Sequence, residues 1–200
     1  MAGSYYHLLR DRAFVGYALT GAMGTAGMFA YIVGSPFVFM NLFHVPANRY
    51  GLFFGVNALG LIMASQLNVR LVRRFETDEV IRKVLLVQLS AAVLLFVGTA
   101  AGVLGLYGTA LLLFTYVGSI GCLFPNTTAL AMAPHPERAG SASALVGVLQ
   151  FSLAAIAAAA VGAANNGTAF PMALVIGTCG VAAVMIHRAV VSPQVLDFGV

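Results

Sequence analysis

The sequence predicts an all-α membrane protein built from six transmembrane helices. Hydrophobic residues make up 60% of its 200 residues and charged residues only 8%, whereas a soluble domain carries about 25% charged residues. The charged residues leave four long uncharged runs, at 13–48, 50–69, 84–136 and 139–187. A helix needs about 20 apolar residues to cross the hydrocarbon core. The runs therefore provide one, one, two and two spans respectively.

Turn-forming residues divide the two longer runs. Glycines at 102, 105 and 108 break the third run, and the segment 165–171 with its Asn, Gly and Pro residues breaks the fourth. We therefore expect one bundle over residues 1–200, with helices at about 14–40, 50–69, 84–104, 107–132, 139–163 and 169–188.

The basic residues predict the orientation of this bundle. With six spans, nine of the ten Lys and Arg residues fall on one side, and only Arg49 falls on the other. Because short cytoplasmic loops carry the excess of Lys and Arg, we expect a multi-pass protein of the cell inner (plasma) membrane with both termini in the cytoplasm. These charges mark helix ends and form no continuous basic face, so nucleic-acid binding is not expected despite the net charge of +4.

The first helix carries small, polar and aromatic residues on one face. Gly24, Met28, Tyr31 and Ser35 recur at helical spacing, so they share that face. Pro36 removes a backbone hydrogen bond and predicts a bend. The glycines fit both close helix packing and the lining of a cavity.

The remaining helices differ in composition. Those at 84–104 and 169–188 are aliphatic almost all round and are predicted to face lipid. The others carry the polar and small residues and are predicted to form an inner wall. Within the helix at 107–132, Pro125 predicts a second bend beside Asn126.

Gln150 is the most informative polar residue of the spans. It lies near the middle of its helix, where an unpaired amide is costly. The amide either bonds to a neighbouring helix, as polar side chains do in membranes, or it faces water and substrate in a central cavity. Asn57 supports the same argument more weakly, because it lies nearer a membrane edge.

A cytoplasmic loop follows the second helix. It contains Asn68, Arg70, Arg73 and Arg74, followed by acidic and further basic residues. Such a mixed charge run is typical of a topology anchor. Alternatively, it is a latch whose arginines bind helix ends or carboxylates in one conformation only.

The sequence contains no pattern typical of an enzyme or of a metal or cofactor site. All six acidic residues are expected outside the spans, and neither a metal-ligand cluster nor a phosphate-binding loop is recognisable. Proton-driven pumps usually carry an ionisable group within the membrane, and these spans provide no carboxylate.

A faint internal repeat relates the two halves of the chain. Residues 29–35 read FAYIVGS and residues 114–119 read FTYVGS. These segments lie in the first helices of two consecutive triplets, which must have opposite orientations because each crosses the membrane three times. The pattern indicates an inverted three-plus-three repeat, as in transporter halves.

Several segments together carry a resemblance to a known family. They are LLRDRAF at 8–14, Asn57, the arginines after the second helix, and AGSASAL at 139–145 followed by Gln150 and Phe151. With these segments the chain resembles the C-terminal half of drug:proton antiporters of the major facilitator superfamily, specifically the Bcr/CflA multidrug resistance group. Its loop after the second helix is similar to the superfamily's cytoplasmic motif but lacks the acid and the glycine expected between Leu71 and Arg73.

The resemblance implies a function for the six helices, which would correspond to helices seven to twelve of the family. They would form one half of an alternating-access exporter of small lipophilic drugs and need a second six-helix half, or a second copy, for activity. The proton-carrying carboxylate would come from the missing N-terminal half. We expect substrate contacts from Phe29, Tyr31, Asn57, Phe114, Tyr116 and Gln150. The alternative is a truncated, non-transporting membrane protein or scaffold that only packs on partner helices.

Overall fold

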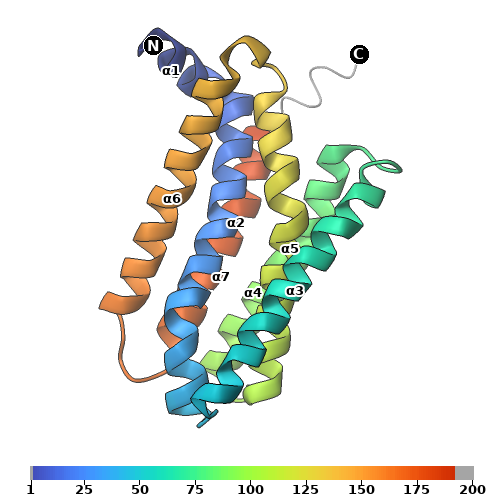
Figure 1. Cartoon of the computed structure of the whole chain (residues 1–200). Coiled ribbons are helices and arrows are strands. Elements are labelled where there is room, and N and C mark those ends of the chain that lie inside the picture. Colours follow the sequence, from blue (N-terminus) through green and yellow to red (C-terminus); the bar gives the residue numbers. More distant parts are fainter. Residues whose placement is uncertain (1, 192–200) are drawn as a thin grey trace.

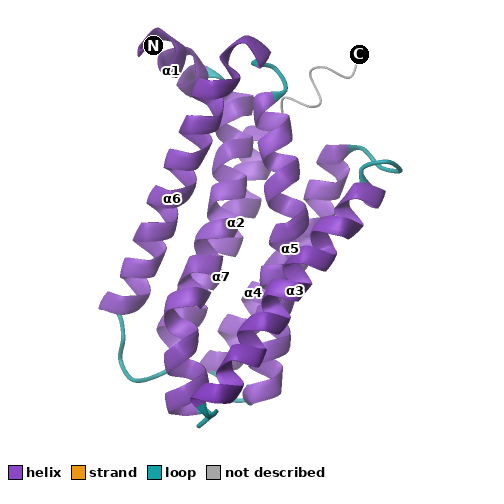
Figure 2. Ribbon diagram, viewed as in Figure 1, coloured by secondary structure: helices purple, strands orange, loops and turns teal. Residues whose placement is uncertain are grey.

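Helices form all the regular structure of the part of the chain that the computed structural model describes, residues 2–191 (Figure 2). The α-helices are α1 (Ala2–Arg10), α2 (Arg12–Pro36), α3 (Ala47–Leu71), α4 (Thr77–Ala100), α5 (Leu106–Met132), α6 (Ala139–Ala163) and α7 (Phe170–Ile186). Two π-helical segments, η1 (Phe37–Leu42) and η3 (His187–Val191), extend α2 and α7, and a short 3-10 turn, η2 (Pro136–Arg138), precedes α6.

Six of these helices are long and apolar enough to cross a membrane. They are α2 to α7, counted with the short extensions at their ends. The predicted all-α fold with six spans is therefore confirmed. The chain is a multi-pass membrane protein.

The six spans pack in two layers (Figure 1). The front layer runs α6, α2, α5, α3, and α7 and α4 lie behind the central pair. As a result α2 and α5 are the most buried spans, whereas α3 and α6 expose most of their surface.

The contacts relate the two triplets of spans symmetrically. The first helix of each triplet packs on the second and third helices of the other: α2 on α6 and α7, α5 on α3 and α4. The two first helices also contact each other, and so do the two third helices. This exchange agrees with the inverted three-plus-three repeat that the sequence indicated.

Some helix boundaries differ from those that the uncharged runs predicted. The third span begins at Thr77, seven residues before the predicted start. The first span continues beyond Pro36 as a π-helix to Leu42. A helix that the sequence did not predict, α1, precedes the first span and buries Leu8 against the bundle.

The interpretation of α4 as aliphatic all round was wrong for one of its faces. Leu86 and Leu94 are exposed on the outer side of α4, as expected for a lipid-facing helix. Its inner stripe, however, includes the carboxylate of Asp78 and the amide of Gln88, which is completely buried. Buried polar side chains therefore also occur in the rear layer of the bundle.

Candidate functional site

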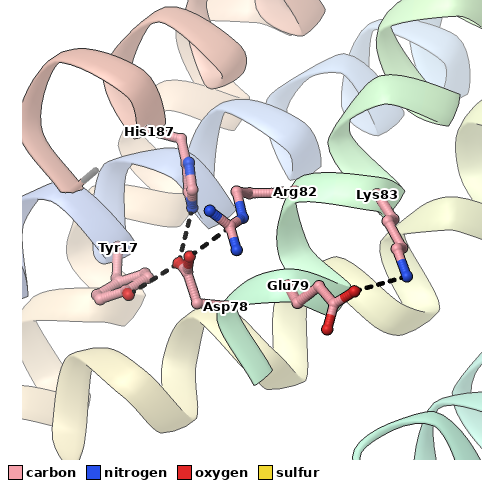
Figure 3. A network of polar contacts seen from close by, with 6 residues as sticks. All are labelled: Tyr17, Asp78, Glu79, Arg82, Lys83 and His187. Carbon is pink, nitrogen blue, oxygen red and sulfur yellow. Dashed lines mark hydrogen bonds and ion pairs between the residues drawn. The ribbon is translucent and has the colours of Figure 1, made fainter. Parts of the chain in front are cut away.

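The most connected polar cluster surrounds Asp78 in the first turn of α4 (Figure 3). The hydroxyl of Tyr17 donates a hydrogen bond to Asp78 Oδ1 at 3.0 Å, and His187 Nε2 lies 3.0 Å from the same oxygen. Arg82 Nε approaches the other carboxylate oxygen at 3.5 Å. The Asp78 side chain is only 11% exposed, and its contacts join α2, α4 and the segment η3 that extends α7.

The local sequence explains why these residues are helical. Asp78 and Glu79 lie in the first turn of α4, where the helix dipole favours negative charge. Each acid pairs with the basic residue four positions later, Asp78 with Arg82 and Glu79 with Lys83. The Glu79 pair, at 2.8 Å, is on the more exposed side of the helix.

This arrangement corrects the prediction that every acidic residue lies outside the spans. The uncharged run begins only at Val84, but the charged residues before it already belong to α4. The i, i+4 spacing of acids and bases is itself a helix signal. It could have placed Asp78 inside the span.

Two further polar contacts lie at the same end of the bundle. Asp11 caps α2 by accepting from the backbone N–H groups of Ala13 and Phe14, and its Oδ2 is 2.8 Å from His135 Nε2. Asn68 and Asn126 exchange two amide hydrogen bonds of 3.0 and 2.7 Å between α3 and α5. Sequence reasoning noticed Asn126 but placed Asn68 in the loop, whereas it is buried in the last turns of α3.

Two of the predicted substrate residues contact each other. Asn57 of α3 donates from Nδ2 to the hydroxyl of Tyr31 in α2 at 2.9 Å, and to the carbonyl oxygen of Phe53 at 3.0 Å. Both side chains are buried, yet Asn57 Oδ1 accepts no hydrogen bond. Phe54 stacks on the Tyr31 ring with a centroid distance of 6.0 Å.

A third predicted residue, Tyr116, is held separately in the interior. Its side chain is fully buried, and its hydroxyl donates to the carbonyl oxygen of Gly24 at 3.1 Å. A side chain at Gly27 would collide with the Tyr116 ring, so the glycine is needed for this close approach. Gln88 lies beside Gly24 with neither amide atom hydrogen-bonded. The sequence did not predict this buried amide, because Gln88 lies in a run of otherwise aliphatic residues.

The other three predicted substrate residues are half-buried. Phe29 meets Phe151 of α6 edge to face, at 6.3 Å between ring centroids. Phe114 covers Gly60 and lines an apolar pocket between α3 and α5. The side chain of Gln150, although half-buried, forms no hydrogen bond within the described part of the chain. Tyr31 and Asn57 thus form the one hydrogen-bonded pair among the six predicted residues.

The predicted latch and bend residues have the following places. Arg70, Arg73 and Arg74 are exposed, and no ion pair involves them within residues 5–191. Pro36 is the last residue of α2, and the π-helical segment η1 follows it directly. Pro125 lies within α5, which continues past it. Within the described residues, no group of three or more His, Cys, Asp and Glu residues could hold a metal ion.

Comparison with known proteins identifies two relatives to which the chain is similar, although no family model matches it. Over 166 residues it is 37% identical to YdgK, an uncharacterized MFS-type transporter of Bacillus subtilis. These aligned residues make up 82% of this chain and 40% of YdgK. Over 199 residues it is 28% identical to a bicyclomycin resistance protein homolog of Haemophilus influenzae. These aligned residues make up 100% of this chain and 50% of that protein. The chain thus spans half or less of these relatives. Their names confirm the predicted resemblance to Bcr/CflA-type transporters of the major facilitator superfamily.

Proposed function

We propose that this six-helix bundle is the C-terminal half of a multidrug exporter that exchanges small lipophilic compounds for protons by alternating access. The observation that carries this proposal is the match of the whole chain to half of a bicyclomycin resistance protein homolog. The six spans and the symmetric packing of their two triplets support it. As the C-terminal half it would supply helices seven to twelve.

The exposed faces of α3 and α6 support the need for a second half. These two spans are the least buried in the bundle. Both carry large exposed apolar side chains, among them Leu52, Val56, Leu59, Ile62, Met63 and Leu67 on α3 and Val148, Phe151 and Ile156 on α6. In the proposed complete transporter, parts of these faces contact the other six helices, or a second copy of this chain, and the rest contacts lipid.

The substrate path is proposed to follow the front layer. Tyr31 and Asn57 offer a polar group between α2 and α3. The unpaired Asn57 Oδ1 is buried in this conformation and can accept a hydrogen bond from a drug in a conformation of the transport cycle that exposes it. Phe29 and Phe114 provide aromatic surface for apolar or cationic compounds. Gln150, half-buried on α6, provides a further amide.

The proton carrier is proposed to be a carboxylate of the other half. Asp78 is buried in a span, but it lies in the first turn of α4 and is already bonded by Tyr17, His187 and Arg82. We assign it to holding three spans together. We also propose that the protein lies in the inner membrane with both termini in the cytoplasm. The reason is that all its Lys and Arg residues except Arg49 lie at the end of the bundle where α2, α4 and α6 begin.

A resistance assay tests the proposed transport. The chain alone and the chain expressed with a candidate N-terminal half are compared in an efflux-deficient bacterium exposed to bicyclomycin and to lipophilic cations. We expect resistance only with both halves, and a loss of at least part of it with Gln150→Leu. Ser90→Leu on the outer side of α4 is the matched control, since it also replaces a polar side chain in a span.

Two results would contradict the proposal. If the chain gave no resistance above that of the empty vector, either alone or with any N-terminal half, the result would argue for the non-transporting scaffold. If Gln150→Leu and Ser90→Leu both left resistance to all compounds unchanged, Gln150 would have no role in the path.

A further inference from the structure

We propose that the pocket between α4 and α7, beside the Asp78 cluster, binds the phosphate of an anionic phospholipid. The pocket is about 180 Å³ in volume and is lined by Arg82, Leu85, Leu86, Val184, His187 and Arg188. It combines two guanidinium groups with three aliphatic side chains at a helix end. Basic pockets between membrane helices on the cytoplasmic side are suited to lipid head groups.

The charges around the pocket favour one negative ligand group. Arg188 is exposed and forms no ion pair within residues 5–191, and the Arg82 side chain is 56% exposed although its Nε faces Asp78. Asp78 neutralises one of these two arginines, and the neighbouring Glu79 and Lys83 neutralise each other. Counted over Arg82, Arg188, Asp78, Glu79 and Lys83, one positive charge is left, which matches the single negative charge of a phosphodiester. The guanidinium geometry suits phosphate oxygens.

The walls of the pocket favour a lipid over a free phosphate ion. Leu85, Leu86 and Val184 would adjoin the glycerol and the first methylenes of a lipid, and Leu86 is half exposed. Inorganic phosphate gains nothing from such apolar walls.

A second groove along the same pair of helices fits an acyl chain. It is lined by Val93, Phe96, Leu174, Gly177, Thr178 and Val181, and no polar surface faces it. Val93 follows Arg82 by eleven residues, which is about 16 Å along a helix. One leaflet of the hydrocarbon core is about 15 Å deep. A lipid with its phosphate at Arg82 and Arg188 therefore has the length to reach this groove.

This inference does not depend on transport, because it concerns the outer side of the rear layer. The test uses the full chain, purified in a neutral detergent. Native mass spectrometry counts bound lipid, and the thermal midpoint is recorded with phosphatidylglycerol, with phosphatidylcholine, and with inorganic phosphate. We expect phosphatidylglycerol to bind and to raise the midpoint, and the other two to have little effect.

Charge-matched variants locate the site. Arg188→Gln should weaken the binding of phosphatidylglycerol about tenfold, because it removes a charge-assisted hydrogen bond of at least about 1.4 kcal/mol. Arg74→Gln removes the same charge from the loop after α3 and should leave binding unchanged. Leu86→Asp, which places a carboxylate at the exposed lip of the pocket, should also weaken binding and does not depend on Arg188.

The outcomes decide between the possible ligands. An equal effect of inorganic phosphate would show a free-anion site and overturn the lipid assignment. Equal binding by the Arg188→Gln, Leu86→Asp and Arg74→Gln variants, or equal binding of both lipids, would overturn the pocket itself.

Discussion

The two ends of the bundle are held together by different means. At the end where α2, α4 and α6 begin, here called the charged end, three groups of polar side chains link different parts of the bundle: Asp78 with Tyr17 and His187, Asp11 with His135, and Asn68 with Asn126. Every charged residue of the described part except Arg49 lies at this end. At the charged end, therefore, polar side chains fix the register of the helices.

The opposite end, where α3, α5 and α7 begin, is here called the aromatic end. Phe39 is completely buried there against the rings of Phe43, Tyr50 and Phe53, with centroid distances of 5.0–6.3 Å. A hydrogen bond of 2.8 Å between the hydroxyls of Ser35 and Tyr50 is added to this packing.

Backbone turns also distinguish the aromatic end. Each of its three connections contains a residue with positive φ: His44 at 52°, Gly102 at 66° and Gly167 at 77°. Glycine adopts this conformation without strain, which explains the two glycines. The connections at the charged end contain no such residue. The comparison teaches that ring packing and turn geometry can replace ion pairs where the sequence places almost no charge.

The largest effect is expected at the aromatic end. Phe39→Ala removes a completely buried ring from the contact between η1 and α3, and should lower the free energy of unfolding by about 3 kcal/mol. Unfolding of the detergent-solubilised protein by a denaturing detergent measures this loss. Tyr107→Ala is the control, because that ring belongs to the same end but is 81% exposed. Equal losses for both variants would mean that the aromatic cluster does not hold this end.

A smaller but clear effect is expected from the buried acid of the charged end. Asp78→Ala leaves the hydroxyl of Tyr17 without its partner and removes a contact of His187, at a cost of about 2 kcal/mol. Glu79→Ala is a matched control on the same helix. It also breaks an i, i+4 pair, but at an exposed position where such a pair contributes less than about 0.5 kcal/mol. Similar losses in the two variants would show that the cluster acts only through charge at the helix end.

The sequence predicted the parts of this molecule that follow from runs of uncharged residues. The number of spans, the all-helical fold and the two triplets required only those runs and the positions of turn residues. The helix start at Thr77 was missed because a run of uncharged residues marks only the apolar part of a helix. The burial of Asp78 was missed for the same reason.

The contacts inside the bundle were beyond the reach of a single sequence. Tyr31 and Asn57 were both selected as polar residues within spans, but their hydrogen bond depends on how α2 meets α3. Gln88 and Gln150 have similar apolar surroundings in the sequence, yet Gln88 faces the interior and Gln150 is half exposed. Such differences arise from helix rotation, which the nearly uniform apolar composition of these spans does not encode.

The smallest effect is expected for the uncharged pair of the charged end. Asn68→Ala leaves the amide of Asn126 unpaired between α3 and α5 and should cost about 1 kcal/mol, within the range found for hydrogen bonds between membrane helices. Asn126→Ala should cost the same, and the double variant little more than either single one. A double-mutant cycle on the unfolding free energies measures this coupling. Strictly additive losses would show that the two amides act independently, and the charged end would then depend on its ionisable pairs alone.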